Sequence, residues 1–188
     1  MLLLSSKLWA FNSAQLAQQL AAAEVVRGEF VQEKHLRSLS MPLSSHGQFV
    51  LSKQHGLLWK VQKPFMQTYR IDDQGVSLFT AKGWQNQPGQ SAAARQSQLF
   101  LAVLQGDQHA LEADFKLQLQ GNAEQWRLQL LPKAVFLQQI FREIEIHGGG
   151  LVERIELHET QGDHTVMRML NSQADSALLD EEQHAFQP

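Results

Sequence analysis

Residues 28–64, GEFVQEKHLRSLSMPLSSHGQFVLSKQHGLLWKVQKP, decide how this chain folds. In an extended backbone Leu57, Trp59 and Val61 point to one side, and the residues between them point to the other. An alternation with period two is typical of a strand that has one apolar face. The pattern therefore predicts a strand over 57–62 that packs mainly on one side.

A second strand precedes this one, because Phe49 and Leu51 repeat the alternation. The pair His55-Gly56 supplies a turn between the two strands. Pro64 ends the second strand, since proline has no backbone N–H for a sheet. Together these signals predict an antiparallel hairpin.

The same alternation of apolar and polar residues recurs along most of the chain, with turn residues at regular spacing. The meander is expected to break at Gly83–Gly89, which has the composition of a loop, and the segment 134–139 is ambiguous. Further strands are expected around residues 28–34, 67–71, 76–80, 115–120, 126–130, 140–146, 151–157 and 166–170.

Two longer segments have helical patterns. The first begins at Asn12, which can cap a helix reciprocally with Gln15. The second covers 91–105 and ends at Gly106. Its last part, Leu99–Leu104, is apolar nearly all the way round, so the helix must be buried or lie on an apolar surface. A shorter helical piece follows from Asp107, and Asp180–Glu182 are expected in a solvated terminal segment.

We therefore predict a mainly β fold with some α structure. About ten or eleven strands with one apolar face need a second layer, and two helices cannot cover a flat sheet of that size. A single strongly curved antiparallel sheet, an unclosed and half-open barrel, satisfies both demands. The N-terminal helix and the inserted helix would cover its concave face.

The composition of the chain excludes several classes of function. The chain has 188 residues and a formal net charge of -3, so no global positive field favours nucleic acid. It has no cysteine, which excludes disulfides and thiol catalysis. Eight histidines are present, yet none belongs to an HExxH motif, and GxSxG and phosphate-binding loops are missing. We expect no enzymatic activity, no metal and no cofactor.

The first ten residues, MLLLSSKLWA, hold an apolar run too short to span a bilayer. They resemble the end of a signal peptide whose basic front is lost, with cleavage after Ala10. A locally packed N-terminus is the alternative. Under the first interpretation, residues 11–188 form a single mature domain.

Several short motifs occur in a fixed order. They are Phe30-x-Gln32-x-Lys34, Pro42-Leu43-Ser44-Ser45-His46-Gly47, Trp59 with Pro64 five positions on, Gly75, Gly162-Asp163-x-Thr165 and Asn171. In this order and spacing they resemble the LolA family of periplasmic outer-membrane lipoprotein carriers, and in particular its LolA-like subgroup. The similarity runs from about Phe11 to the C-terminus.

The resemblance implies a periplasmic, monomeric carrier whose barrel takes the acyl chains of a lipoprotein or another lipid-linked molecule. An inner-membrane transporter would load it, and an outer-membrane acceptor would unload it. Carriers of this family hold the lid with an arginine six positions before the tryptophan, where this chain has Lys53. Lysine lacks the planar fork of arginine, so we expect either that Lys53 latches the lid differently or that the cargo differs from the usual lipoprotein.

On this interpretation the inserted helix is a lid that contributes Leu99, Phe100, Leu101 and Leu104. The residues expected to line the lipid-binding cavity are Phe30, Phe49, Leu51, Leu57, Trp59, Tyr69, Ile71, Phe115, Leu117, Trp126 and Leu128. Taken singly, each of them is better explained as an ordinary core residue, and only the whole set favours a cavity wall. Two alternatives stay open at this point: a protein that uses the curved sheet to bind a protein partner, and, with less support, a lipid hydrolase.

Overall fold

The computed structural model describes residues 11–88 and 92–187, which form eleven strands and five helices. The strands are β1 (Val25–His35), β2 (Leu43–Ser52), β3 (Gly56–Lys63), β4 (Gln67–Asp72), β5 (Gly75–Thr80), β6 (Gly83–Asn86), β7 (Phe115–Asn122), β8 (Gln125–Pro132), β9 (Phe141–Gly148), β10 (Val152–Glu159) and β11 (His164–Asp175). The helices are α1 (Ser13–Leu20), α2 (Ala92–Gln105), α3 (Gln108–Asp114), α4 (Val135–Gln138) and α5 (Asp180–Phe186).

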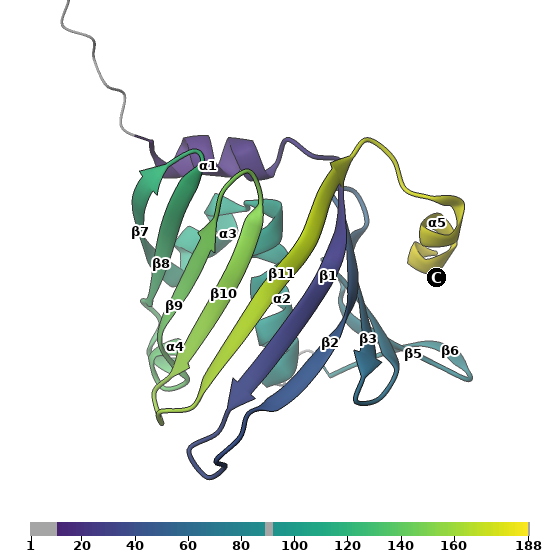
Figure 1. The fold of residues 1–188 in the computed structure, drawn as a ribbon, viewed down its shortest axis with the longest axis horizontal. Coiled ribbons are helices and arrows are strands. Elements are labelled where there is room, and N and C mark those ends of the chain that lie inside the picture. Colours follow the sequence, from purple (N-terminus) through teal and green to yellow (C-terminus); the bar gives the residue numbers. More distant parts are fainter. Residues whose placement is uncertain (1–10, 89–91, 188) are drawn as a thin grey trace, which may run out of the picture.

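All eleven strands belong to one antiparallel sheet with the order β6-β5-β4-β3-β2-β1-β11-β10-β9-β8-β7. The first and last strands of the chain, β1 and β11, pair at its centre, and β6 and β7 are its edges. The sheet curves around α2, and α1 lies across one end of it (Figure 1). The predicted fold class, an unclosed half-barrel covered by helices, is confirmed.

Helix α1 begins as its sequence predicts. The Gln15 N–H donates to Asn12 Oδ1, and the Asn12 N–H donates to Gln15 Oε1, both at 3.0 Å. This reciprocal cap satisfies two backbone donors that a helix start leaves free. Leu16 and Leu20 are buried, so α1 presents one apolar face to the sheet end.

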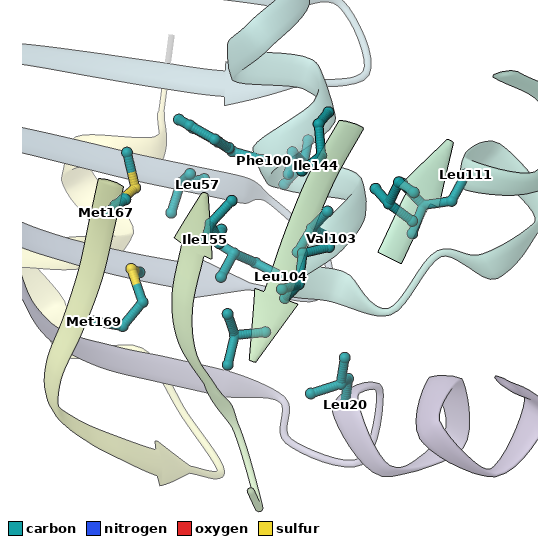
Figure 2. Packing of buried hydrophobic residues seen from close by; sticks show 14 of the residues in the cluster. Leu20, Leu57, Phe100, Val103, Leu104, Leu111, Ile144, Ile155, Met167 and Met169 are labelled. Atoms are coloured by element: carbon teal, nitrogen blue, oxygen red, sulfur yellow. The ribbon is translucent and has the colours of Figure 1, made fainter. Parts of the chain in front are cut away.

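Helix α2 fills the concave side of the sheet. Its side chains Phe100, Val103 and Leu104 are buried, and Figure 2 shows them lying among strand residues such as Leu57 and Ile155. These residues belong to one continuous apolar cluster that also includes α1. The core of the molecule is therefore the space between α2 and the curved sheet.

One prediction at the margin of the sheet was wrong. Gly83–Asn86 is strand β6 and not a loop, because the Thr80 hydroxyl bonds to the Gly83 carbonyl and closes a tight turn. Trp84 then packs edge-on against Phe79, with ring centroids 5.2 Å apart. The expected loop extended to residue 89, which lies outside the described residues. The ambiguous segment 134–139 contains the single turn α4.

The C-terminal segment is a helix, α5, and not a solvated tail. Glu182, which we expected to be exposed, is only 4 % exposed because Arg27 of β1 binds it with two hydrogen bonds of 3.0 and 2.9 Å. At the other end of α5, Arg70 of β4 donates to the carbonyls of Phe186 and Gln187. Phe186 closes a second apolar cluster with Val25, Val50 and Leu58, on the convex face of the sheet.

Two motif residues have structural explanations. Gly47 lies where the β2–β3 register shifts, and a side chain there would come within 1.9 Å of the Lys60 carbonyl oxygen. Asn171 has a positive φ of 52° and donates to Glu29 across an irregularity between β1 and β11. Phe30 and Trp59, two further motif residues, stack at 3.8 Å. These motif residues therefore have structural roles in the sheet.

Candidate functional site

The predicted wall residues come together on the concave face. Tyr69 and Leu117 are half-buried and pack against one apolar cluster, and the other nine residues are buried within it. These nine are Phe30, Phe49, Leu51, Leu57, Trp59, Ile71, Phe115, Trp126 and Leu128. The predicted wall residues thus form one apolar surface, to which six different strands contribute.

The predicted lid residues cover this surface. Phe100, Leu101 and Leu104 are buried, and Leu99 is half-buried against the same cluster. A small space of about 20 Å³ persists between the end of α2, α1 and strands β7 to β9. That volume is the size of about one water molecule. The described interior is therefore filled by the protein's own side chains.

A much larger space lies on the other side of α2. It is a groove of about 850 Å³, half open to solvent, whose floor is the outer face of the helix. The turns β2–β3 and β4–β5 form one wall, and α3, α4 and the beginnings of β7 and β9 form the other. Its lining includes Lys53, His55, Asp73, Arg95, Gln98, Leu101, Leu111, Phe115, Phe136, Leu137, Ile140, Phe141 and Phe186.

The groove has the size of a ligand site and one apolar wall. Small-molecule sites commonly have volumes of about 300 to 1,000 Å³. Phe136, Leu137, Ile140 and Phe141 line one wall with apolar side chains, while the opposite wall carries charged and polar groups. This arrangement suits an amphiphile better than a fully polar ligand.

Two contacts tie the first half of α2 across the groove. The Gln98 side-chain amide donates to the Asp72 backbone carbonyl at 2.8 Å, which joins α2 to the β4–β5 turn. The Arg95 guanidinium lies 4.7 Å from the centre of the Phe136 ring, which joins α2 to α4. Sequence reasoning missed both, because a single polar residue on a helix does not indicate which loop it reaches.

The end of α2 is fixed by close packing. A side chain at Gly106, which has a positive φ of 67°, would come within 2.8 Å of Leu20 and 3.0 Å of the Ala17 carbonyl of α1. Helix α1 is held in turn by Gln19, whose side-chain amide donates to the Gly149 carbonyl at 2.6 Å. The C-terminal end of α2 is therefore the fixed end, and Gln98 and Arg95 restrain the N-terminal half.

Lys53, the candidate latch, lies in the β2–β3 turn at the edge of the groove. Its ammonium pairs with Glu24 at 3.4 Å, and both side chains are about half exposed. An exposed pair of this kind contributes at most about 1 kcal/mol. The hydrogen bond from α2 to the β4–β5 turn comes from Gln98 instead.

Tyr69 places a polar group within the apolar wall. Burial raises the pKa of its hydroxyl, which donates to Gln67 Oε1 at 2.9 Å. The phenol therefore stays neutral over the physiological pH range.

The convex face carries histidines and glutamates in two clusters. Ligand-type atoms lie within 4.8 Å of one another in Glu143, Glu145 and His158, and in Glu145, His147 and Glu156. Arg127 forms a bidentate pair with Glu145, and Arg154 pairs with Glu156 at 2.7 Å. In Glu145 burial raises the carboxyl pKa, but the bonds from Arg127 and His147 outweigh it and lower the pKa. These are ion pairs of a solvated sheet face, as expected for glutamates on strands.

Among the described residues, no helix is long and apolar enough to cross a membrane. The fold and the groove define a class of protein: a half-open β-barrel with a helix lying across its apolar concave face. The sequence profile of the outer membrane lipoprotein carrier protein LolA-like family matches residues 6–187. The chain belongs to this family.

Solved structures show the same fold at low sequence identity. A LolA superfamily protein from Nitrosomonas europaea superposes with a TM-score of 0.54 and 8 % identity, over 91 % of this chain and 97 % of that chain. A DUF1329 family protein from Desulfovibrio piger gives 0.53 and 14 %, over 93 % and 96 %. A chain in the MucA/MucB complex of Pseudomonas aeruginosa gives 0.51 and 17 %, over 92 % and 58 %. A comparison with curated proteins found no match to this sequence.

Proposed function

We propose that this chain is a periplasmic carrier that binds the acyl chains of a lipoprotein or another lipid-linked molecule between α2 and the curved sheet. It works by displacement of a lid helix and makes or breaks no covalent bond. The observation that carries the proposal is the chemistry of the closed site. Large apolar side chains of α2 cover the concave surface, so a hydrocarbon chain can take their place.

The energies of such an exchange nearly balance. Uncovering four large side chains of α2 costs about 6 to 12 kcal/mol, at about 1.5 to 3 kcal/mol for each. Burying an acyl chain of about fifteen methylene groups returns about 12 kcal/mol, at about 0.8 kcal/mol for each group. A near balance is what a carrier needs, because loading and release must both be accessible.

The groove outside α2 supports a route for the cargo. Its apolar wall reaches from α4 to Phe115, which also belongs to the interior cluster. We propose that a hydrocarbon chain first lies against this wall and then enters as the half of α2 that carries Arg95 and Gln98 moves away. Gln98 is the proposed latch. A role of Lys53 also stays a prediction, and slower cargo transfer by a Lys53→Leu variant would support it.

The family suggests the partners of the carrier. We propose an inner-membrane transporter as donor, an outer-membrane acceptor, and a monomeric carrier between them. Nothing in the proposed mechanism requires a cofactor.

A second candidate function is an interaction protein whose α2 never moves. The filled interior favours this alternative, because a close-packed core leaves no room for a guest. Such a protein would use a sheet face to bind a protein partner, and it would not respond to amphiphiles.

Displacement of a fluorescent fatty acid distinguishes the two functions. The carrier is expected to bind the probe and to release it to competing alkyl carboxylates, with an affinity that rises about fourfold for each added methylene. Native mass spectrometry should detect one fatty acid on each folded chain. Absence of uptake at every chain length would contradict the carrier and favour the interaction protein.

A further inference from the structure

The two ends of the half-barrel differ in surface chemistry. At one end lie the connections β1–β2 (36–42), β3–β4 (64–66), β5–β6 (81–82), β8–β9 (133–140) and β10–β11 (160–163). We call these five segments the lower rim, because the β1–β2 connection and α4 lie at the bottom of Figure 1. The connections α1–β1, β2–β3, β4–β5, β7–β8, β9–β10 and β11–α5 lie at the opposite, upper end.

Exposed apolar side chains gather at the lower rim. Ten large apolar residues are exposed among those that the structure describes, and eight of them lie in these connections or within two residues of them. Met66 is 86 % exposed, Phe65 77 % and Met41 76 %. The eight residues are Leu39, Met41, Leu43, Phe65, Met66, Phe79, Val135 and Phe136.

The two ends also differ in charge: basic residues predominate at the lower rim and acidic residues at the upper end. The lower-rim segments contain Arg37, Lys82 and Lys133 against the single acid Asp163. Of the charged residues directly beside them, Lys63 is exposed and Glu159 pairs with Lys34 at 3.5 Å. The upper connections at 21–24, 53–55, 73–74, 123–124, 149–151 and 176–179 contain three acids and one lysine. The chain, with a net charge of -3, thus has a basic apolar end and an acidic end.

We propose that the lower rim docks on the surface of an anionic lipid bilayer. Apolar side chains at loop tips can enter the boundary between headgroups and acyl chains, and neighbouring cations are attracted to anionic headgroups. The acidic upper end would then face away from the membrane. The proposal does not rest on acyl-chain binding, since a chain that takes up no fatty acid can still bind vesicles.

A single introduced cysteine tests the contact directly, because the chain has no cysteine of its own. Phe65→Cys and, as a matched control, Leu170→Cys are labelled with an environment-sensitive fluorophore. Leu170, like Phe65, is an exposed apolar residue, but it lies in β11, away from the lower rim. With vesicles of mixed phosphatidylglycerol and phosphatidylcholine, we expect a blue shift from the label at 65 and none from the label at 170.

Vesicle sedimentation tests the electrostatic part. Lys63→Gln with Lys82→Gln should lower partition into anionic vesicles about 25-fold, since each lysine contributes about fivefold. Lys53→Gln, at the upper end, should leave partition unchanged. Added salt should weaken binding, and pure phosphatidylcholine should bind less.

Three outcomes would overturn the proposal. They are no sedimentation with anionic vesicles at low salt, equal shifts from both labels, and equal losses for Lys53→Gln and the rim variant. In the first case the apolar rim would be left for a protein partner. Each of these results leaves the fatty-acid assay free to succeed or fail independently.

Discussion

Helices α2 and α5 cover opposite faces of the same sheet and are held by different forces. Helix α2 packs on the concave face through apolar side chains, with Gln98 supplying a hydrogen bond to the β4–β5 turn. Helix α5 lies on the convex face and is clamped at both ends by arginines. Arg27 binds Glu182 and Asp175 at its beginning, and Arg70 binds backbone carbonyls at its end.

The difference indicates which helix can move for a lipid. Apolar contact is not directional, so an acyl chain can replace the side chains of α2 at little net cost. A hydrocarbon cannot replace the bonds to Glu182, whose carboxylate would be left buried without a partner. On physical grounds α2 is the exchangeable element and α5 is the fixed one.

The largest effect is expected from cavities cut on the two faces. Measured with urea, Phe100→Ala in α2 should lower the free energy of unfolding by about 3 to 5 kcal/mol, and Leu58→Ala under α5 by about 2 to 5 kcal/mol. A saturating fatty acid should restore stability to Phe100→Ala, because the chain fills the concave site. Equal recovery of Leu58→Ala would mean that fatty acid does not distinguish the concave face from the convex face.

The next effect comes from the clamp of α5. Arg27→Met leaves the Glu182 carboxylate unpaired and should cost about 2 to 3 kcal/mol of unfolding free energy. Adding Glu182→Gln should recover part of that loss, since no buried charge is then left unpaired; Asp175, the other partner of Arg27, is half exposed. Fatty acid should not help either variant, and rescue by fatty acid would show that α5 also responds to the lipid.

Acid should weaken α5 and leave the contacts of α2 unchanged. In Glu182 burial raises the carboxyl pKa, but bonds from Arg27 and the Leu179 N–H outweigh it and lower the pKa below its ordinary 4.5. The Ser176 N–H and Arg27 lower the pKa of Asp175 below 3.8. This stabilisation is complete above the ordinary values and is lost as the pH falls through the lower, folded values.

Urea unfolding over a pH series measures this loss. We expect a decline in stability of the wild type between about pH 5 and about pH 3, and a flatter profile for Arg27→Met. Parallel profiles for the two proteins would mean that the clamp does not carry the pH dependence.

The smallest effect concerns the latch. Gln98→Ala removes one hydrogen bond of about 1 kcal/mol and should speed fatty-acid uptake about fivefold. Gln96→Ala, on the same helix, serves as the matched control and should not change the rate. An unchanged rate of fatty-acid uptake in Gln98→Ala would mean that this hydrogen bond does not hold α2 closed.

The sheet could be predicted from sequence because its signals are local. Alternation at Leu57, Trp59 and Val61 and the turn at His55-Gly56 need no distant information. The cap of α1 by Asn12 and Gln15 is local for the same reason. The concave wall followed, since residues on one face of successive strands meet once the sheet is curved.

The features that sequence analysis missed depend on contacts between distant segments. Strand β6 needs the Thr80 turn and the packing of Trp84 on Phe79, and α5 needs Arg27, which lies 155 positions away from Glu182. The bond from Gln98 to the Asp72 carbonyl spans 26 positions and involves no side chain of Asp72. No periodicity records such pairings.

Locking α2 in place tests whether this helix must move before a lipid can enter. Gln98→Cys and Asp73→Cys introduce the only thiols of the chain, on opposite sides of the latch, and a short crosslinker with a reducible spacer joins them. The Gln98→Cys variant alone is the control. We predict that the crosslinked protein takes up no fluorescent fatty acid and that reduction restores uptake. Uptake by the crosslinked protein at the rate of the control would contradict a mobile α2.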